Sequence, residues 1–282
     1  MKNLRQIKDL IKNIANEKNI NSQILLKNYM IHRLLKRIYL SEYSKFFIIK
    51  GGILITGIIG VQARTTVDLD TTINSFPINN DSLKSMFNEI FSTKTEDGIE
   101  FKLKKLDGIR EESEYEGFRL SILALMGKAR IPLKIDLTTG DKLTPAEINY
   151  SYQLLFEDKK IELLSYNLET LLAEKFETIV SRSLTNTRMR DFYDVYILAA
   201  EYKDKINMEL LAVALTETAK NRGSYKSIKN GRQILIDIFN SDIILNHWNR
   251  YRNKFQYAKD IEFSSLKEEV MNLWGTIESV DK

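Results

Sequence analysis

The hydrophobic pattern of this chain changes near residue 165, and that change limits the folds it can adopt. Before this point, short apolar runs typical of strands alternate with amphipathic segments, whereas after Asn167 the apolar residues keep helical spacing. Strands gathered in one part of a chain and helices in another indicate an α+β protein. We therefore predict a mixed sheet with flanking helices over residues 1–165 and an all-helical half over residues 166–282.

The expected elements follow from the same patterns. In the first half we predict helices over residues 3–17, 22–41 and 80–92, the last capped by Asn80 or Asp81, and a buried helical segment in the uncharged run "ILITGIIGV". Strands are expected over residues 45–52, 63–73, 99–106, 118–127 and 131–140, and two short ones within 152–166. In the second half, helices are expected over residues 168–184 (capped by Asn167), 189–203, 207–221, 230–254 and 264–278.

Composition excludes several classes of protein. The chain has 282 residues and a net charge of +4, with no cysteine and only two histidines. Disulfides and cysteine-based metal sites are therefore excluded, and a histidine-rich zinc site is disfavoured. The first 19 residues lack the continuous apolar stretch of a signal peptide, and no segment is long enough to span a bilayer. We expect a soluble cytoplasmic protein that does not bind membranes.

Two aspartates stand one residue apart in the otherwise apolar run "VDLDTTI". Because a strand alternates its faces, Asp68 and Asp70 should point the same way and Leu69 the other way. Like charges at this spacing repel each other, so burial without compensation is unfavourable. The simpler interpretation is a solvated or turn-capping pair.

Three neighbouring features favour a functional site instead. Gly51 and Gly52 end a strand-like run, where exposed backbone N–H groups suit phosphate binding. Asp136 interrupts a second apolar strand, and Arg64 and Thr66 supply donors beside the aspartate pair, as does Thr65. Three carboxylates at adjacent strand ends would form an oxygen-rich site for Mg²⁺ or Mn²⁺, with Asp68, Asp70 and Asp136 as its ligands.

A resemblance gives these features a common meaning. A glycine pair, a helix, a D-x-D strand and a third aspartate on a later strand form a pattern that resembles the nucleotidyltransferase superfamily. The chain is similar to the AbiEii/AbiGii toxins of bacterial type IV toxin–antitoxin and abortive-infection systems through five motifs in the family's order: "FFIIKGGILI", "ARTTVDLDTTI", "KIDL", "LLAEKFETIVSR" and "RMRDFYDVYIL". The similarity runs from about residue 25 to 200. The superfamily has Gly-Ser where this chain has Gly51-Gly52, so a serine contact to phosphate is not implied.

The resemblance also assigns roles in the helical half. Lys175 lies beside an apolar stripe, where the spacing alone indicates a solvated lysine, but the family places a lysine there that faces the nucleotide phosphates. Asp191 and Asp194 share a helical face and by spacing alone could form surface ion pairs. The resemblance makes Asp191 an active-site residue, while Asp194 supports it or holds Lys175.

The resemblance therefore implies a nucleotidyltransferase-like domain over residues 1–165 and a helical domain over residues 166–282 that completes the active-site cleft. The expected reaction moves a nucleotide from an NTP to an acceptor, with RNA, and tRNA 3′ ends in particular, as the first choice. The expected outcome in the cell is growth arrest or abortive phage infection. The partner would be an antitoxin, a winged-helix protein acting without a stable complex.

Two other functions remain open at this point. A metal-dependent nuclease also uses paired carboxylates and a lysine, although it has no need of the glycine pair. A non-catalytic regulator could keep the fold and bind nucleic acid or a protein. The stretch "NHWNRYRNKFQY", with Trp248 and Tyr251 among basic residues, could bind RNA by stacking, but aromatic residues at this spacing more often pack a helical core.

Overall fold

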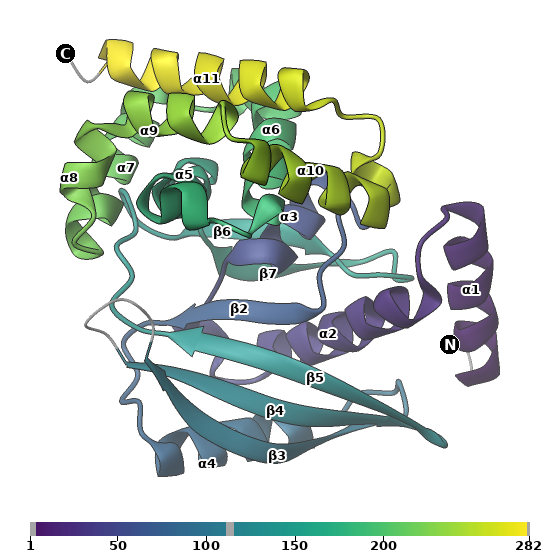
Figure 1. Cartoon of the computed structure of the whole chain (residues 1–282). Coiled ribbons are helices and arrows are strands. Elements are labelled where there is room, and N and C mark those ends of the chain that lie inside the picture. Colours follow the sequence, from purple (N-terminus) through teal and green to yellow (C-terminus); the bar gives the residue numbers. More distant parts are fainter. Residues whose placement is uncertain (1–3, 111–115, 281–282) are drawn as a thin grey trace. The chain divides into compact units, whose positions relative to one another are not determined.

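The computed structural model describes residues 4–110 and 116–280 of the chain (Figure 1). The chain divides into two compact units. The sheet unit comprises Met1–Gly140 and Ile148–Ser165, and the helical unit comprises Asp141–Glu147 and Tyr166–Lys282. The predicted α+β class is confirmed, because every described strand belongs to the sheet unit.

The strands of the described chain form one seven-stranded mixed sheet in the order β3-β4-β5-β2-β1-β7-β6. Strand β2 pairs in parallel with β5, and β1 pairs in parallel with β7, while the remaining neighbours are antiparallel. The strands are β1 (Phe47–Ile49), β2 (Asp68–Ile73), β3 (Ile99–Arg110), β4 (Glu116–Met126), β5 (Ala129–Thr138), β6 (Ile148–Gln153) and β7 (Lys160–Ser165).

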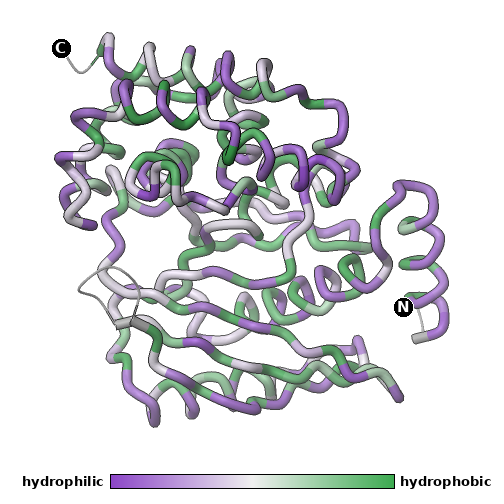
Figure 2. The backbone as a smooth tube through the Cα atoms, viewed as in Figure 1, coloured by the Kyte–Doolittle hydropathy of each residue, from purple (hydrophilic) through white to green (hydrophobic). Residues whose placement is uncertain are grey.

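Four α-helices of the described residues belong to the sheet unit: α1 (Leu4–Glu17), α2 (Ser22–Leu40), α3 (Gly51–Ile59) and α4 (Asn80–Ser92). Helix α2 contacts β5 and β7, α4 contacts β3, and α3 contacts β2. Alternate residues of the strands, such as Leu69, Leu120 and Ile135, are fully buried in the core of this unit. Figure 2 shows the corresponding alternation of hydrophilic and hydrophobic residues along β3 and β5.

Several elements of the sheet unit begin or end elsewhere than the sequence predicts. Strand β2 begins at Asp68 rather than at residue 63, and β6 begins at Ile148 rather than within residues 152–166. The strand expected over residues 45–52 has only three residues, because Gly51 and Gly52 already form the first turn of α3. Helix α4 is capped by Asn79 rather than by Asn80 or Asp81, and the Asn79 side chain accepts from the backbone N–H groups of Asp81 and Ser82. A cap must lie before the first helical residue, and one residue is a common error in such predictions.

The helical unit contains the other α-helices of residues 4–110 and 116–280. They are α5 (Leu168–Arg182), α6 (Met189–Tyr202), α7 (Met208–Asn221), α8 (Tyr225–Lys229), α9 (Gly231–Phe239), α10 (Asp242–Lys254) and α11 (Phe263–Val280). In the part of the chain that the structure describes, short 3₁₀ turns occupy Ser44–Phe46, Ser183–Thr185, Lys203–Lys205 and Gln256–Ala258. The prediction of one helix over residues 230–254 is wrong, because the segment breaks at Asn240 and Ser241 into α9 and α10.

The first helix of this unit is anchored by an earlier segment of chain. Asn167 caps α5 by accepting from Thr170 N at 2.8 Å, as predicted. The Asn167 amide donates to the Thr144 carbonyl at 2.7 Å, and the Thr170 hydroxyl donates to the same carbonyl at 3.2 Å. Residues 141–147 are therefore part of the helical unit although they precede β6 and β7 in sequence.

The aromatic stretch near residue 250 packs the core of the helical unit. Trp248 is fully buried and donates to the Ile261 carbonyl, and Tyr251 is also buried, with its ring stacked on that of Trp248 at 5.5 Å. Two of the aromatic side chains that could have stacked on RNA bases are thus inside the protein. Among residues 4–110 and 116–280, the helices lack the combination of length and apolar composition that a bilayer crossing requires.

His32 gives the sheet unit a measurable dependence on pH. Its Nδ1 accepts from Leu155 N at 2.9 Å, and its Nε2 lies 3.2 Å from the Tyr152 hydroxyl. Burial, with the nearby Arg33 charge as a second cause, lowers the pKa of His32 to about 3. The folded protein therefore holds this imidazole neutral at pH values where the unfolded chain protonates it.

We expect the free energy of unfolding to fall by about 2 kcal/mol between pH 6.5 and 4.5 because of His32. The unfolded chain binds the additional proton throughout this range, so this contribution is complete above the unfolded pKa and is lost as the pH falls towards the folded pKa. Urea unfolding of the wild type and of His32→Gln at several pH values measures it. Equal pH slopes for the two proteins would contradict the assignment.

Candidate functional site

Asp68, Asp70 and Asp136 lie on one face of two neighbouring strands. In the parallel pairing of β2 and β5, Asp70 lies opposite Asp136, and Asp68 lies opposite Lys134. Leu69 and Ile135 point to the other face and are fully buried, while the three aspartates are partly exposed. The expectation that Asp68 and Asp70 share a face is confirmed by this register.

Arg119 is the residue of this face that sequence reasoning missed. It lies on β4 directly opposite Asp136 and forms a two-pronged ion pair with it, with Nε to Oδ1 and Nη2 to Oδ2 both at 2.7 Å. This hydrogen-bonded contact with Asp136, assisted by the charges of Asp68 and Asp70, raises the pKa of Arg119. A lone charge in the apolar run "GFRLSILAL" is the same signal that identified Asp136, and it could have identified Arg119.

The chemistry of this carboxylate group fits a hard divalent cation, since oxygen ligands are those that Mg²⁺ and Mn²⁺ select. In the structure, however, both oxygens of Asp136 accept from Arg119. Over residues 4–110 and 116–280, no three histidine or acidic side chains are grouped closely enough to hold a metal ion. An ion shared by all three aspartates thus requires Asp136 to exchange Arg119 for the ion.

Gly51 is required by the position of Asp70. Its φ is +58°, a conformation that side chains with a Cβ rarely adopt. A Cβ at Gly51 would lie 2.5 Å from Oδ2 and 3.0 Å from Cβ of Asp70. The Asp70 carboxylate therefore packs directly against the first residue of α3, where the helix dipole favours a negative charge.

Gly52 makes room for the other two residues singled out beside the aspartates. A Cβ at this position would collide with the Arg64 guanidinium and the Thr66 hydroxyl. Arg64 is 2% exposed and donates from Nη1 to the Gly52 carbonyl at 3.0 Å. Thr66 is also buried, and its carbonyl accepts from Asn28 Nδ2 at 2.7 Å. Arg64 thus holds the glycine pair in place through a hydrogen bond from the protein interior.

In the helical unit, Lys175 lies between two aspartates of α6. Its Nζ is 2.6 Å from Asp191 Oδ1 and 3.2 Å from Asp194 Oδ2, and Arg188 Nε is 3.0 Å from Asp191 Oδ2. Asp191 and Asp194 are almost completely buried, and Lys175 is 9% exposed. The alternative of a solvated surface lysine is therefore wrong, and two cations balance two carboxylates in this group.

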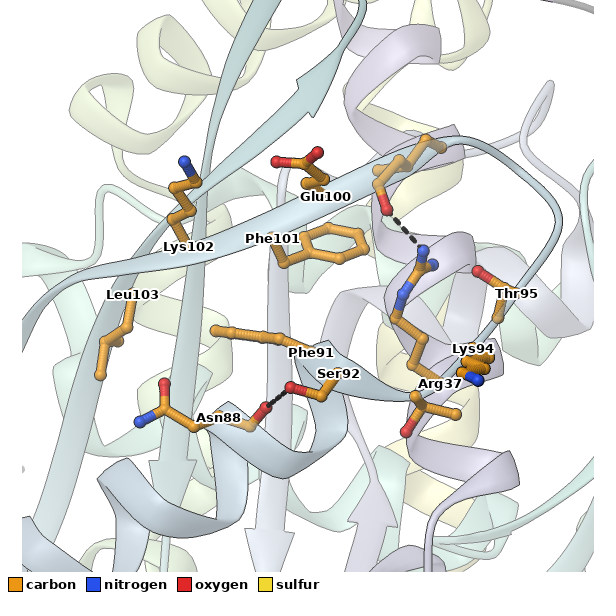
Figure 3. Close-up of a pocket in the computed structure, with 12 residues that line it drawn as sticks. Arg37, Asn88, Phe91, Ser92, Lys94, Thr95, Glu100, Phe101, Lys102 and Leu103 are labelled. Carbon is orange, nitrogen blue, oxygen red and sulfur yellow. Dashed lines mark hydrogen bonds between the residues drawn. The ribbon is translucent and has the colours of Figure 1, made fainter.

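A pocket of about 590 Å³ lies elsewhere in the sheet unit, at the outer edge of β3. Figure 3 shows Glu100 and Lys102 on one side of this strand and Phe91 and Arg37 on the other. The rings of Phe91 and Phe101 are 5.8 Å apart, and none of the aspartates of the carboxylate group lines the pocket.

Comparison with known proteins identifies the family and the fold of the chain. The sequence profile of the family described as "Nucleotidyl transferase AbiEii toxin, Type IV TA system" matches residues 33–269. The crystal structure of JHP933 from Helicobacter pylori is similar with a TM-score of 0.53 and 16% identity, covering 93% of this chain and 94% of that one. A second H. pylori protein, provisionally named a nucleotidyltransferase, has a TM-score of 0.52 and 15% identity, covering 93% of this chain and 98% of that one.

At these identities the two crystal structures support the fold alone, whereas the family match carries the assignment. No curated protein matches the chain. The family match spans most of the sequence, from the middle of α2 into α11, and includes every residue of the carboxylate group and of the Lys175 group. The chain therefore belongs to the AbiEii family, the nucleotidyltransferase toxins of type IV toxin–antitoxin systems.

Proposed function

We propose that this chain transfers a nucleotide from an NTP to the 3′ end of an RNA, with tRNA as the first candidate, in a reaction that depends on Mg²⁺ or Mn²⁺. One observation carries the proposal: Asp70 stands in register with Asp136, Asp68 shares their face, and Asp70 packs on the first turn of α3. Carboxylates and the N-terminus of α3 are thus close together, as a triphosphate bound through metal ions requires.

In this proposal the residues of the sheet unit have different roles in the reaction. The acceptor hydroxyl attacks the α-phosphorus, the bond to the bridging oxygen breaks, and pyrophosphate leaves. Asp136 takes the hydroxyl proton once Arg119 has moved away, and Arg119 then has its guanidinium available for phosphate oxygens. Most of the rate comes from positioning and from stabilising charge, because phosphoryl transfer needs little covalent help.

Asp68, Asp70 and Asp136 would hold the metal, which would supply positive charge to the triphosphate and the leaving pyrophosphate. Gly51 and Gly52 would offer backbone N–H groups to the phosphates, and Thr66 would help bind the nucleotide. For Arg64 we propose a positioning role, since its guanidinium already donates to the Gly52 carbonyl. Lys175 would contact the triphosphate, and Asp191 and Asp194 would hold its ammonium group in place.

The deciding experiment incubates the protein with radiolabelled NTPs, Mg²⁺ and total RNA. Label at RNA 3′ ends supports nucleotide transfer, whereas shortened RNA without label would support a metal-dependent nuclease. Sequencing the RNA of cells that express the protein, for untemplated 3′ nucleotides, identifies the acceptor. A titration that shows no binding of Mg²⁺ or Mn²⁺ would favour a non-catalytic regulator.

We also propose a cognate antitoxin as a partner, because the family is defined by such pairs. A winged-helix protein encoded by the neighbouring gene is the expected antitoxin, acting without a stable complex. Coexpression should then relieve growth inhibition, although the two proteins do not copurify. Copurification in equal amounts would contradict the second part of this proposal.

Substitution of Gly51 tests the link between the glycine pair and Asp70. Gly51→Ala should destabilise the protein by about 1–2 kcal/mol through its positive φ alone, and by more because the new Cβ meets Asp70. Gly98→Ala is the matched control, since Gly98 has a similar φ of +64° but nothing within 4 Å of a Cβ. We expect Gly98→Ala to lose only stability and Gly51→Ala to lose transfer as well. Normal transfer by a folded Gly51→Ala would contradict the arrangement.

A further inference from the structure

The face that carries Asp136 extends well beyond the carboxylate group. Strands β3, β4 and β5 pair antiparallel, so residues directly opposite each other share a face. From the carboxylate end outward, this face consists of four cross-strand rows: Asp107, Arg119 and Asp136; Lys105, Ser121 and Lys134; Lys102, Leu123 and Pro132; and Glu100, Leu125 and Arg130.

The sign of the charge changes along these rows. Two of the three charges in the first row are negative, whereas the three outer rows of β3 to β5 contain four cations and Glu100. Lys105 is paired with Asp107 at 2.8 Å. Lys102, Arg130 and Lys134 are exposed, and each of them has no ion pair or hydrogen bond with any side chain in residues 4–110 and 116–280.

Protection of a sheet edge does not explain this set of cations. Lysines commonly prevent edge strands from pairing with other chains, and Lys102 on the edge strand β3 fits that role. Lys134, however, lies where β5 is paired on both sides, by β4 and by β2, whereas Arg130 lies beyond the end of β2 and is paired with β4 alone. Their alternation with the buried Ile131 and Leu133 turns both cations to the side of Asp136.

The basic rows also contain apolar surface. Leu123 and Leu125 are half-buried and Pro132 is exposed on this same face, between the cations. The pocket at the edge of β3 borders the face at Glu100 and Lys102, and Lys94 lines it as well (Figure 3). Exposed cations with apolar side chains between them match a strand of alternating phosphates and bases better than an acidic protein surface.

We infer that the single-stranded 3′ end of the acceptor nucleic acid lies along this face of β3 to β5, with its phosphates at Lys134, Lys102 and Arg130 and its terminal hydroxyl at Asp136. The inference rests on the proposed nucleotide transfer, for which it names the surface that holds the acceptor. Lys134 is about 7 Å and Arg130 about 20 Å along β5 from Asp136, at roughly 3.3 Å per residue. The face can therefore hold several nucleotides behind the reacting end.

The test compares two triple variants in a fluorescence anisotropy titration with a labelled single-stranded RNA at several salt concentrations. The first variant replaces Lys102, Arg130 and Lys134 with glutamine. The control replaces three other exposed lysines with glutamine. They are Lys12 on α1, Lys159 just before β7 and Lys160 at the start of β7. Each lost phosphate contact lowers the salt slope of binding to a single strand by about 0.7, so the first variant should lose about 2 and the control nothing.

Nucleotide binding should be unchanged in the control variant, and it is measured separately in the first variant because Lys134 lies opposite Asp68 of the carboxylate group. The inference is overturned if the wild type does not bind the RNA, if the first variant keeps the wild-type slope, or if the control loses as much. Polyglutamate, added so that it supplies as many negative charges as the RNA, gives a further test. The inference is also overturned if it displaces the RNA from the wild type but not from the first variant. RNA binding that depends on these cations, without nucleotide transfer, would contradict the proposed function and leave this face as an RNA-binding surface.

Discussion

Replacing Asp70 or Asp68 with alanine is expected to abolish nucleotide transfer while the protein stays folded. The two carboxylates share one face of β2 and are partly exposed, so neither supports the core. Removal of one of two like charges relieves repulsion and can raise the free energy of unfolding in the absence of metal. Transfer assays in Mg²⁺, with thermal unfolding of each variant, measure both effects, and growth inhibition should be lost with transfer.

Asp107→Ala is the control for this prediction. Asp107 lies in the same cross-strand row as Asp136 and Arg119, and its carboxylate is paired with Lys105 at the surface. We expect this variant to transfer nucleotides like the wild type, because Asp107 has no role in the proposed reaction. Near-normal transfer by Asp68→Ala or Asp70→Ala would show that the metal is held elsewhere.

Lys175→Ala is expected to have a large effect on both stability and nucleotide binding. It leaves the buried Asp191 and Asp194 without their shared cation, which should lower the free energy of unfolding by about 3–5 kcal/mol. Loss of a charge-assisted phosphate contact should weaken nucleotide binding by about ten- to a hundredfold. Lys175→Arg should restore function only in part, since a planar guanidinium does not reproduce a compact ammonium group.

Two further variants separate these effects. Lys175→Met combined with Asp194→Asn removes one charge of each sign, so it should regain much of the stability but not the nucleotide affinity. Arg222→Met is the matched control, because Arg222, like Lys175, forms ion pairs with two carboxylates of one helix. Its partners are Glu174 at 2.5 Å and Glu177 at 2.8 Å, both on α5. This variant should lose stability but bind nucleotide normally. Recovery of affinity in the double variant would assign Lys175 a purely structural role.

Much of the fold could be predicted because hydrophobic period and caps are local properties. The alternation along β5 and the Asn167 cap of α5 both appear in the structure as expected. The break between α9 and α10 was missed because the residues around Asn240 keep an amphipathic pattern on both sides. The sequence did contain a local signal, since Asn240 and Ser241 are residue types typical of a helix end and a helix start.

The shared face of the candidate residues could be predicted, but their contacts could not. Single charges in apolar strands identified Asp68, Asp70 and Asp136, yet the partner of Asp136 depends on which strands are neighbours. Arg119 became visible only through the pairing of β4 with β5. For Lys175 even the burial could not be predicted from spacing. Helical spacing alone indicated a solvated lysine, whereas packing against α6 buries it.

The helical unit is built from two separate segments of the chain, residues 141–147 and 166–282, and this limits where the gene can be divided. A fragment that begins at residue 166 would lack Thr144, whose carbonyl accepts from Asn167 and Thr170 in the first turn of the helix that carries Lys175. A fragment that begins at residue 141 would include β6 and β7, which belong to the sheet. No single cut in the coding sequence releases either unit whole. Recombination within this region would therefore damage both units, and the two are expected to be inherited and exchanged between genomes as one block.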